Sequence, residues 1–243
     1  MALSTYAANL YVEAPLIVDE SDLQENFTFT NTDCFFETGL STFPNGKAIA
    51  RTDSNDNLVS AENFDISDGG SGDDFVINYW WERTSGGANL FPIGAGDFTP
   101  GTRNIVIQHR STTLSIYLGD DTGDTTVFTE VTGTPKMFTW IYDASEDEIW
   151  LHVNGAYEET LTPPFSGGIS YNSVPLRIFD CADSSTAADA RMASLRIWKG
   201  TTLGITENDG DATGHLAELY ALTEAEATEA SVSRVNMGLG ISL

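Results

Sequence analysis

Short segments in which apolar and polar residues alternate dominate the sequence from about residue 26 onward. Segments 74–81 and 192–198 are rich in aromatic and aliphatic residues, and 104–109 and 113–118 resemble two strands joined by a polar turn. Segments 136–142 and 148–153 follow the same pattern, and Gly, Asp, Asn, Ser or Pro bound them. A period of two between turn residues predicts β-strands.

Segment 136–142 differs from the others because both of its predicted faces are apolar. One face carries Phe138, Trp140 and Tyr142, and the other carries Met137 and Ile141. A strand that is apolar on both sides belongs in the middle of a sheet, since an edge would leave it exposed. The next strand ends at Asn154-Gly155, which is typical of a tight hairpin turn.

About a dozen strands at this spacing predict an all-β fold, a two-sheet antiparallel jelly-roll sandwich, which we place at residues 26–214. Residues 1–25 are expected to form an N-terminal acidic arm, since residues 1–46 hold seven acidic residues and no Lys or Arg. Residues 215–243 are expected to form one short C-terminal helix and an apolar tail. Within 215–229 the helical stripe is Leu216, Leu219, Tyr220 and Leu222.

Charge narrows the partners of this predicted sandwich. The 243 residues include 36 Asp and Glu against 11 Lys and Arg, a net charge of −25. Nucleic acid and anionic membranes both require clustered basic residues, so neither is expected as a partner. The start of the chain lacks the features of a secretory signal, and no apolar run reaches the roughly 18 residues of a membrane span. Cys34 and Cys181 are expected as two thiols, although they could pair in an oxidising setting.

Three segments, in order along residues 57–222, resemble the laminin G-like or concanavalin A-like jelly roll. They are 75–81, then 138–143 with 149–155 ending in Val153-Asn154-Gly155, then 192–199 followed by Ala217-Glu218-Leu219-Tyr220. The chain departs from that family at Ala190, Arg191 and Ser194, where Gly and Asp are common. The resemblance implies two antiparallel sheets of six or seven strands each. It leaves the ligand open, because this fold carries lectins, hydrolases and structural modules.

No residue pattern points clearly to catalysis, and we predict that the protein is not an enzyme. Glu20-Ser21-Asp22-Leu23-Gln24-Glu25 has the spacing of a glycoside hydrolase carboxylate pair, but it lies in the expected arm and lacks apolar alternation. We therefore interpret it as a solvated acidic segment. His109, His152 and His215 stand far apart, without a second His or a Cys at metal spacing.

Calcium is the one candidate cofactor, because three acidic turns offer the oxygen ligands that hard cations prefer. They are residues 53–57, 119–124 and 207–218, and a plain polar turn is the interpretation we favour for each. Aromatic side chains could instead stack on sugars, with Trp80, Trp81, Trp150, Trp198 and Tyr157 as candidates. Packing inside the sandwich is the interpretation we favour for them, although adjacent Trp80 and Trp81 point to opposite faces, so at most one should be core.

The two ends of the chain suggest assembly. Apolar residues in the arm and tail could dock onto a larger partner or a second copy, and the candidate interface residues are Leu10, Tyr11, Leu16, Ile17, Met237, Leu239 and Ile241. Frayed ends would explain the same pattern. We expect a homo-oligomer.

The hypothesis we prefer is a non-enzymatic structural or adhesion module on a virion surface, such as a phage capsid decoration or fibre component. It rests on the resemblance, because laminin G-like modules often decorate phage particles. Its partners would be the major capsid protein, host-surface glycans, or both. A soluble, calcium-dependent or calcium-independent lectin is the alternative, and a glycoside hydrolase is the third candidate. The alternative location is the cytoplasm, or release without a signal.

Overall fold

The computed structural model describes residues 9–14, 16, 22, 24–43, 46–53, 55–66, 74–85, 89–97, 103–119, 124–129, 131–162, 172–181 and 189–206. All the regular elements in these ranges are strands. In chain order they are β1 (Leu10–Ala14), β2 (Phe29–Thr32), β3 (Phe35–Thr38), β4 (Lys47–Arg51), β5 (Asn57–Asn63), β6 (Phe75–Arg83), β7 (Asn89–Ala95), β8 (Ile105–Arg110), β9 (Thr113–Leu118), β10 (Asp124–Val127), β11 (Lys136–Asp143), β12 (Glu148–Val153), β13 (Ala156–Leu161), β14 (Pro175–Ile178) and β15 (Ala190–Lys199).

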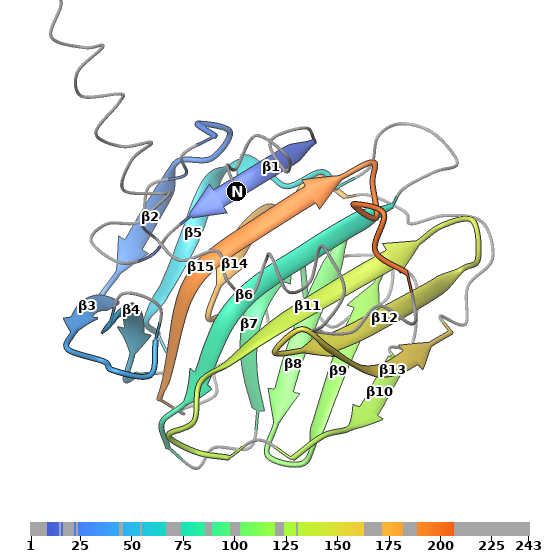
Figure 1. Ribbon diagram of the computed structural model, residues 1–243. Coiled ribbons are helices and arrows are strands. Elements are labelled where there is room, and N and C mark those ends of the chain that lie inside the picture. The colour runs from blue at the N-terminus through green and yellow to red at the C-terminus, as the bar shows by residue number, and fades with distance from the viewer. Residues whose placement is uncertain are drawn as a thin grey trace, which may run out of the picture.

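These strands form two antiparallel sheets that pack face to face (Figure 1). The eight-stranded sheet has the order β13-β12-β11-β6-β15-β4-β3, and β1 pairs with β15 beside this path. The seven-stranded sheet has the order β10-β9-β8-β7-β14-β5-β2 and lies behind it in Figure 1. The predicted all-β, two-sheet antiparallel sandwich is therefore confirmed, and one sheet has one strand more than the six or seven that the resemblance implied.

The strand predictions made from alternation match this arrangement closely. β8 and β9 form the expected hairpin, with Ile107 opposite Ile116. β11 lies between β6 and β12, as its two apolar faces predict. The β12–β13 turn has positive φ at both Asn154 and Gly155, 53° and 83°, the backbone that favours this dipeptide in hairpins.

The main core fills the space between the sheets, and period-two alternation explains it. Along β6, the inward positions Phe75, Ile77, Tyr79 and Trp81 are all at most 1% exposed and belong to the main core cluster. Trp80 and the other even positions point to the opposite, outer face of the eight-stranded sheet. Trp80 is also buried, in a second apolar cluster. The expectation that at most one of the two adjacent tryptophans is core was wrong, because this sheet is buried on both faces.

The first residues of the expected arm form part of the sandwich where the structure describes them. β1 pairs with β15, with Glu13 opposite Arg196 and Ala14 opposite Leu195. Val12 and Ala14 are fully buried in the main core. The division at residue 25 stays a prediction, as does the C-terminal helix and tail at 215–243, which lies outside the described residues.

Two further observations concern the described residues alone. Cys34 and Cys181 are both buried, and neither takes part in a disulfide there. No helix in that part of the chain is long and apolar enough to cross a bilayer.

Candidate functional site

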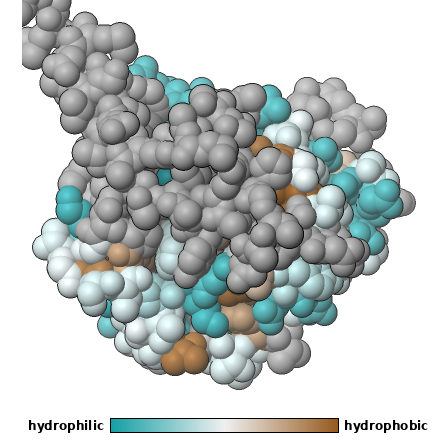
Figure 2. All heavy atoms as spheres, in the orientation of Figure 1, coloured by the Kyte–Doolittle hydropathy of each residue, from teal (hydrophilic) through white to brown (hydrophobic). Residues whose placement is uncertain are grey.

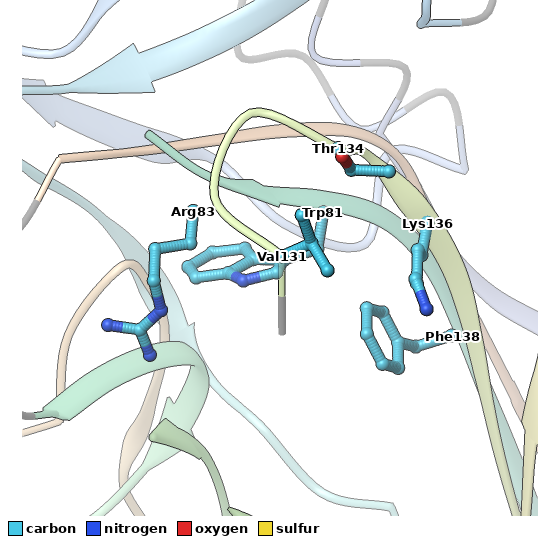
Figure 3. Close-up of a pocket in the computed structure, with 6 residues that line it drawn as sticks. All are labelled: Trp81, Arg83, Val131, Thr134, Lys136 and Phe138. Atoms are coloured by element: carbon cyan, nitrogen blue, oxygen red, sulfur yellow. The ribbon is translucent and has the colours of Figure 1, made fainter. Parts of the chain in front are cut away.

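A hollow opens at one rim of the sandwich, where β6 ends, β11 begins and residues 131–135 lead into β11. We call it the rim hollow and define it by its lining residues, which are Trp81, Arg83, Val131, Thr134, Lys136 and Phe138 (Figure 3). It encloses about 190 Å³ between atoms, part of it open to solvent. Because that space includes open solvent, the rim hollow is a shallow depression and not an enclosed pocket, and only a small group could enter it.

Strand register brings the lining residues together. Trp81 and Arg83 are inward-facing positions of β6, and Lys136 and Phe138 are alternate residues of β11. Lys136 pairs with Trp81 across the two strands. Two cations and two aromatic rings thus meet because two strand ends lie side by side.

The base of the rim hollow is aromatic and rigid. Trp81 and Phe138 are each 1% exposed. The His109 ring packs edge-on against both, with centroid distances of 5.2 Å to Trp81 and 4.7 Å to Phe138. Tightly packed rings of this kind hold an aromatic surface in place without a ligand.

A buried hydrogen-bond network supports this base from the core side. The Trp140 indole N–H donates to the Tyr79 hydroxyl at 3.1 Å, and that hydroxyl lies 2.9 Å from His109 Nε2. Because the hydroxyl oxygen accepts from Trp140, its own hydrogen can point to His109. In that arrangement Nε2 accepts the hydroxyl hydrogen.

The two cations of the rim hollow are held differently. Arg83 is 3% exposed, and its Nη2 donates to the backbone carbonyl of His109 at 2.9 Å. Lys136 Nζ lies 4.7 Å from the centre of the Phe128 ring, a cation–π contact. In a chain with 11 basic residues and a net charge of −25, two cations at one hollow make a local exception to the acidic surface.

One polar atom at the hollow has no hydrogen-bond partner within the described part of the chain. It is Nε1 of Trp81, which is buried. In Figure 3 this nitrogen lies on the side of the indole that faces the space between Arg83 and Phe138. Most buried donors in proteins are paired, so an unpaired one beside a hollow marks a place where a ligand acceptor would fit.

The six described lining residues of the rim hollow carry no carboxyl group. Glycoside hydrolysis needs two such groups across the bond. Neighbouring Glu82 lies on the opposite face of β6, where it accepts a 3.0 Å bond from Arg191.

The hydrolase-like hexapeptide at 20–25 has a structural role at its described centre. Asp22 is 5% exposed, and its two carboxylate oxygens accept backbone N–H groups of Glu13, Gln24, Asn26 and Phe27 at 2.9–3.1 Å. Burial raises the pKa of Asp22, while these hydrogen bonds act against the increase. The interpretation of this segment as solvated was therefore wrong for Asp22, and Glu20 lies outside the described residues.

The candidate calcium turns stay a prediction. In the 53–57 turn, Asp56 Oδ2 accepts the backbone N–H groups of Thr52 and Asp53 at 2.9 Å, as an ordinary turn carboxylate does. Residues 120–123 and 207–218 of the other two turns lie outside the described residues. In the part of the chain that is described, no three His, Cys, Asp or Glu side chains gather as a metal site would require.

Only some of the expected assembly residues lie within the described part of the chain. Leu10 packs against the second apolar cluster, on the outer face of the eight-stranded sheet. Tyr11 lies against Phe27 with ring centroids 5.2 Å apart, and Leu16 is fully buried in the main core. Ile17, Met237, Leu239 and Ile241 lie outside the described residues. An assembly interface formed by these residues stays a prediction.

The sugar-platform candidates are mostly packing residues. Trp80, Trp81, Trp150 and Trp198 are buried, whereas Tyr157 is 39% exposed and its hydroxyl contacts Thr160 Oγ1 at 3.1 Å. Sequence reasoning missed Arg83, Val131, Thr134 and Lys136. For Arg83 and Lys136 the available signal was that a rare cation stands at the end of an aromatic strand, in Trp80-Trp81-Glu82-Arg83 and in Lys136-Met137-Phe138.

Solved structures with a similar fold include binding domains of toxins. The binding domain of Paraclostridial Mosquitocidal Protein 1 aligns with a TM-score of 0.62 at 13% identity, over 89% of this chain and 52% of that one. The botulinum neurotoxin type G receptor binding domain gives 0.58 at 12% identity, over 88% and 51%. The serotype D ligand binding domain, solved in complex with N-acetylneuraminic acid, gives 0.59 at 9%, over 90% and 51%.

This chain thus spans about half the length of each of those domains, and identities this low support the fold alone. No family model and no curated protein matches the sequence. The β-sandwich fold is therefore supported by structural likeness, and a laminin G-like membership is not.

Proposed function

We propose that this protein is a non-enzymatic binding module that recognises a glycan carrying a carboxylate, through the rim hollow. The observation that carries the proposal is the unpaired indole N–H of Trp81 between Arg83 and Lys136. The likeness to toxin binding domains, one of them solved with a sialic acid, supports the same class of ligand.

The chemistry of the lining fits an acidic sugar better than a neutral one. A carboxylate accepts charge-assisted hydrogen bonds from guanidinium and ammonium groups, which are stronger than neutral ones. The Thr134 hydroxyl and the Trp81 N–H add neutral donors, and Val131, which is 56% exposed, offers apolar contact beside them. A shallow hollow would contact the carboxylate edge of one residue and leave the rest of the glycan outside.

A glycan array tests the proposal, run with the full chain in buffer with calcium and in buffer with chelator. We expect signals on sialylated or uronate-containing glycans, weaker signals on their neutral counterparts, and no dependence on calcium. Absence of any glycan signal in both buffers would overturn the proposal.

Lys136→Gln and Lys47→Gln form a matched pair of variants for this test. Each removes one charge at the first residue of a strand, and β4 lies three strands from β11 in the sheet order. Lys136→Gln should weaken binding about tenfold, the effect of roughly 1.4 kcal/mol, while Lys47→Gln leaves it unchanged. Equal effects of the two would show only general charge attraction and remove the rim hollow from the proposal.

The setting we propose is a virion surface, where the module would serve as a capsid decoration or fibre component. The strong acidic excess supports it, since a charge of −25 resists association at high local concentration. Mass spectrometry of purified particles tests this part separately. Detection of the chain in intact particles supports the setting, and its absence overturns it without affecting glycan binding.

A further inference from the structure

The outer face of the eight-stranded sheet is organised in three rows that run across the strands. Trp198, Val76, Ile141 and Trp150 form one apolar row through β15, β6, β11 and β12. Arg196, Asn78, Thr139 and His152 form the polar row next to it. Ala193, Trp80 and Met137 continue the apolar surface on the far side.

All of these outward side chains are buried. None is more than 9% exposed, and Val76, Met137, Ile141 and Trp198 are fully inaccessible. A sandwich has water on its outer faces unless another segment covers them. Figure 2 is taken from this side, and the described surface at the margins of the face is mainly hydrophilic.

Few described apolar side chains from outside these rows pack in the same second apolar cluster. They are Leu10, Leu40, Phe43, Leu203 and Ile205. Five aliphatic or aromatic side chains cannot cover three rows across four strands, which extend over about 14 Å from β15 to β12 at the usual strand spacing. One buried polar atom on the face, Asn78 Oδ1, also lacks a hydrogen-bond partner in the described part of the chain.

The chain itself leads onto this face. Ile205, in the second apolar cluster, is followed after one residue by the 37 residues 207–243. The helix predicted at 215–229 would be about 22 Å long, enough to cross the four strands. Its stripe of Leu216, Leu219 and Tyr220 is apolar, and the seven acidic residues of 207–229 leave its other side suited to water.

We propose that residues 207–243 dock on the outer face of the eight-stranded sheet of their own chain, as a strap that covers the apolar rows. Leucine and tyrosine side chains of the strap lie against Trp80, Trp150 and Trp198, and its donors complete the polar row at Asn78. The strap lies on the opposite side of the sheet from the rim hollow, so this inference is independent of the proposed glycan binding.

A spin label on the full chain carrying Ala221→Cys tests the docking directly. Position 221 lies on the predicted helix face opposite the stripe, and buried Cys34 and Cys181 are protected from labelling. The indole N–H resonances of Trp80, Trp150 and Trp198 should broaden strongly, and backbone amides of β9 in the other sheet should not. Unbroadened outer-face indoles would overturn the proposal.

Mixing identifies which chain supplies the strap. Spin-labelled chain without ¹⁵N is mixed with ¹⁵N-labelled chain without a spin label. Docking within one chain predicts no broadening in this mixture. Broadening would show that the strap comes from a second copy and would overturn docking within the chain.

Two variants with the same introduced residue give a second test. Leu219→Glu places a carboxylate against the apolar rows, whereas Ala221→Glu places it in water. Acrylamide should quench tryptophan emission more strongly in Leu219→Glu than in the wild type, and Ala221→Glu should match the wild type. Equal quenching in all three proteins contradicts the proposal, and the spin-label result decides it if Leu219→Glu fails to fold.

Discussion

Trp140 and Trp81 lie on adjacent strands of one sheet, point to the same side and are almost equally buried, at 0% and 1% exposure. Their indole nitrogens nevertheless have different surroundings. The Trp140 N–H donates to Tyr79 in the middle of the core, and the Trp81 N–H at the rim has no partner among the described residues. An unpaired buried donor costs about 1–3 kcal/mol.

This difference separates stability from binding within one core. In the middle of the sandwich, polar atoms are paired with one another, so the interior is complete without a ligand. At the rim, the indole N–H of Trp81 has no partner among the described residues, and it lies beside Arg83 and Lys136. Substitutions that compare the two regions should therefore affect stability in one and binding in the other.

The largest expected effect is that of Trp140→Ala in the middle of the core. Removing a fully buried indole leaves a cavity and takes away the N–H donor to the Tyr79 hydroxyl. The free energy of unfolding should therefore fall by about 3–5 kcal/mol. Urea denaturation followed by circular dichroism measures it. A loss below about 1 kcal/mol would mean that this interior is loosely packed and that the comparison fails.

Asp22→Asn ranks second, because Asp22 uses both oxygens to hold four backbone N–H groups. An asparagine offers one oxygen, so two of these N–H groups lose their acceptor. The free energy of unfolding should fall by about 2–4 kcal/mol. A loss within error of zero would show that this segment does not depend on Asp22.

The stability of the wild type relative to Asp22→Asn should depend on pH in a definite direction. Burial raises the pKa of Asp22 in the folded protein, so the folded state binds this proton more tightly than the unfolded state. The stabilisation from that proton is complete below the unfolded pKa and is lost as the pH rises through the folded pKa. The difference in unfolding free energy between the wild type and Asp22→Asn should therefore shrink as the pH rises across this acidic range. Urea denaturation of both proteins at a series of pH values measures it.

Tyr79→Phe is a smaller test of the paired interior. It removes the hydroxyl that joins Trp140 to His109, and the free energy of unfolding should fall by about 1–3 kcal/mol. Tyr142→Phe is the matched control, because its hydroxyl makes one 3.3 Å bond to the partly exposed Asp147. Equal losses for the two variants would mean that the core network adds nothing beyond a surface hydrogen bond.

The sequence predicts local features of this fold well and remote ones poorly. Alternation locates β6, β8, β9, β11, β12 and β15, and Asn154-Gly155 marks its turn, because both signals depend on neighbouring residues. The rim hollow depends on the register that sets Lys136 opposite Trp81 and on the path of residues 131–135. The burial of Trp80 depends on a cover from elsewhere in the chain. The alternation of apolar and polar residues along a strand predicts neither the rim hollow nor the burial of Trp80.

Trp81→Phe gives the smallest expected change in stability and the sharpest test of the rim. It keeps an aromatic ring and removes an N–H that has no partner in the described part of the chain. The free energy of unfolding should change by about 1 kcal/mol or less, because removal of the unpaired donor offsets the lost packing. Binding to the acidic glycan should weaken about fivefold to tenfold, because one ligand hydrogen bond is lost. Calorimetric titration measures the second effect, and unchanged affinity would place the ligand away from Trp81.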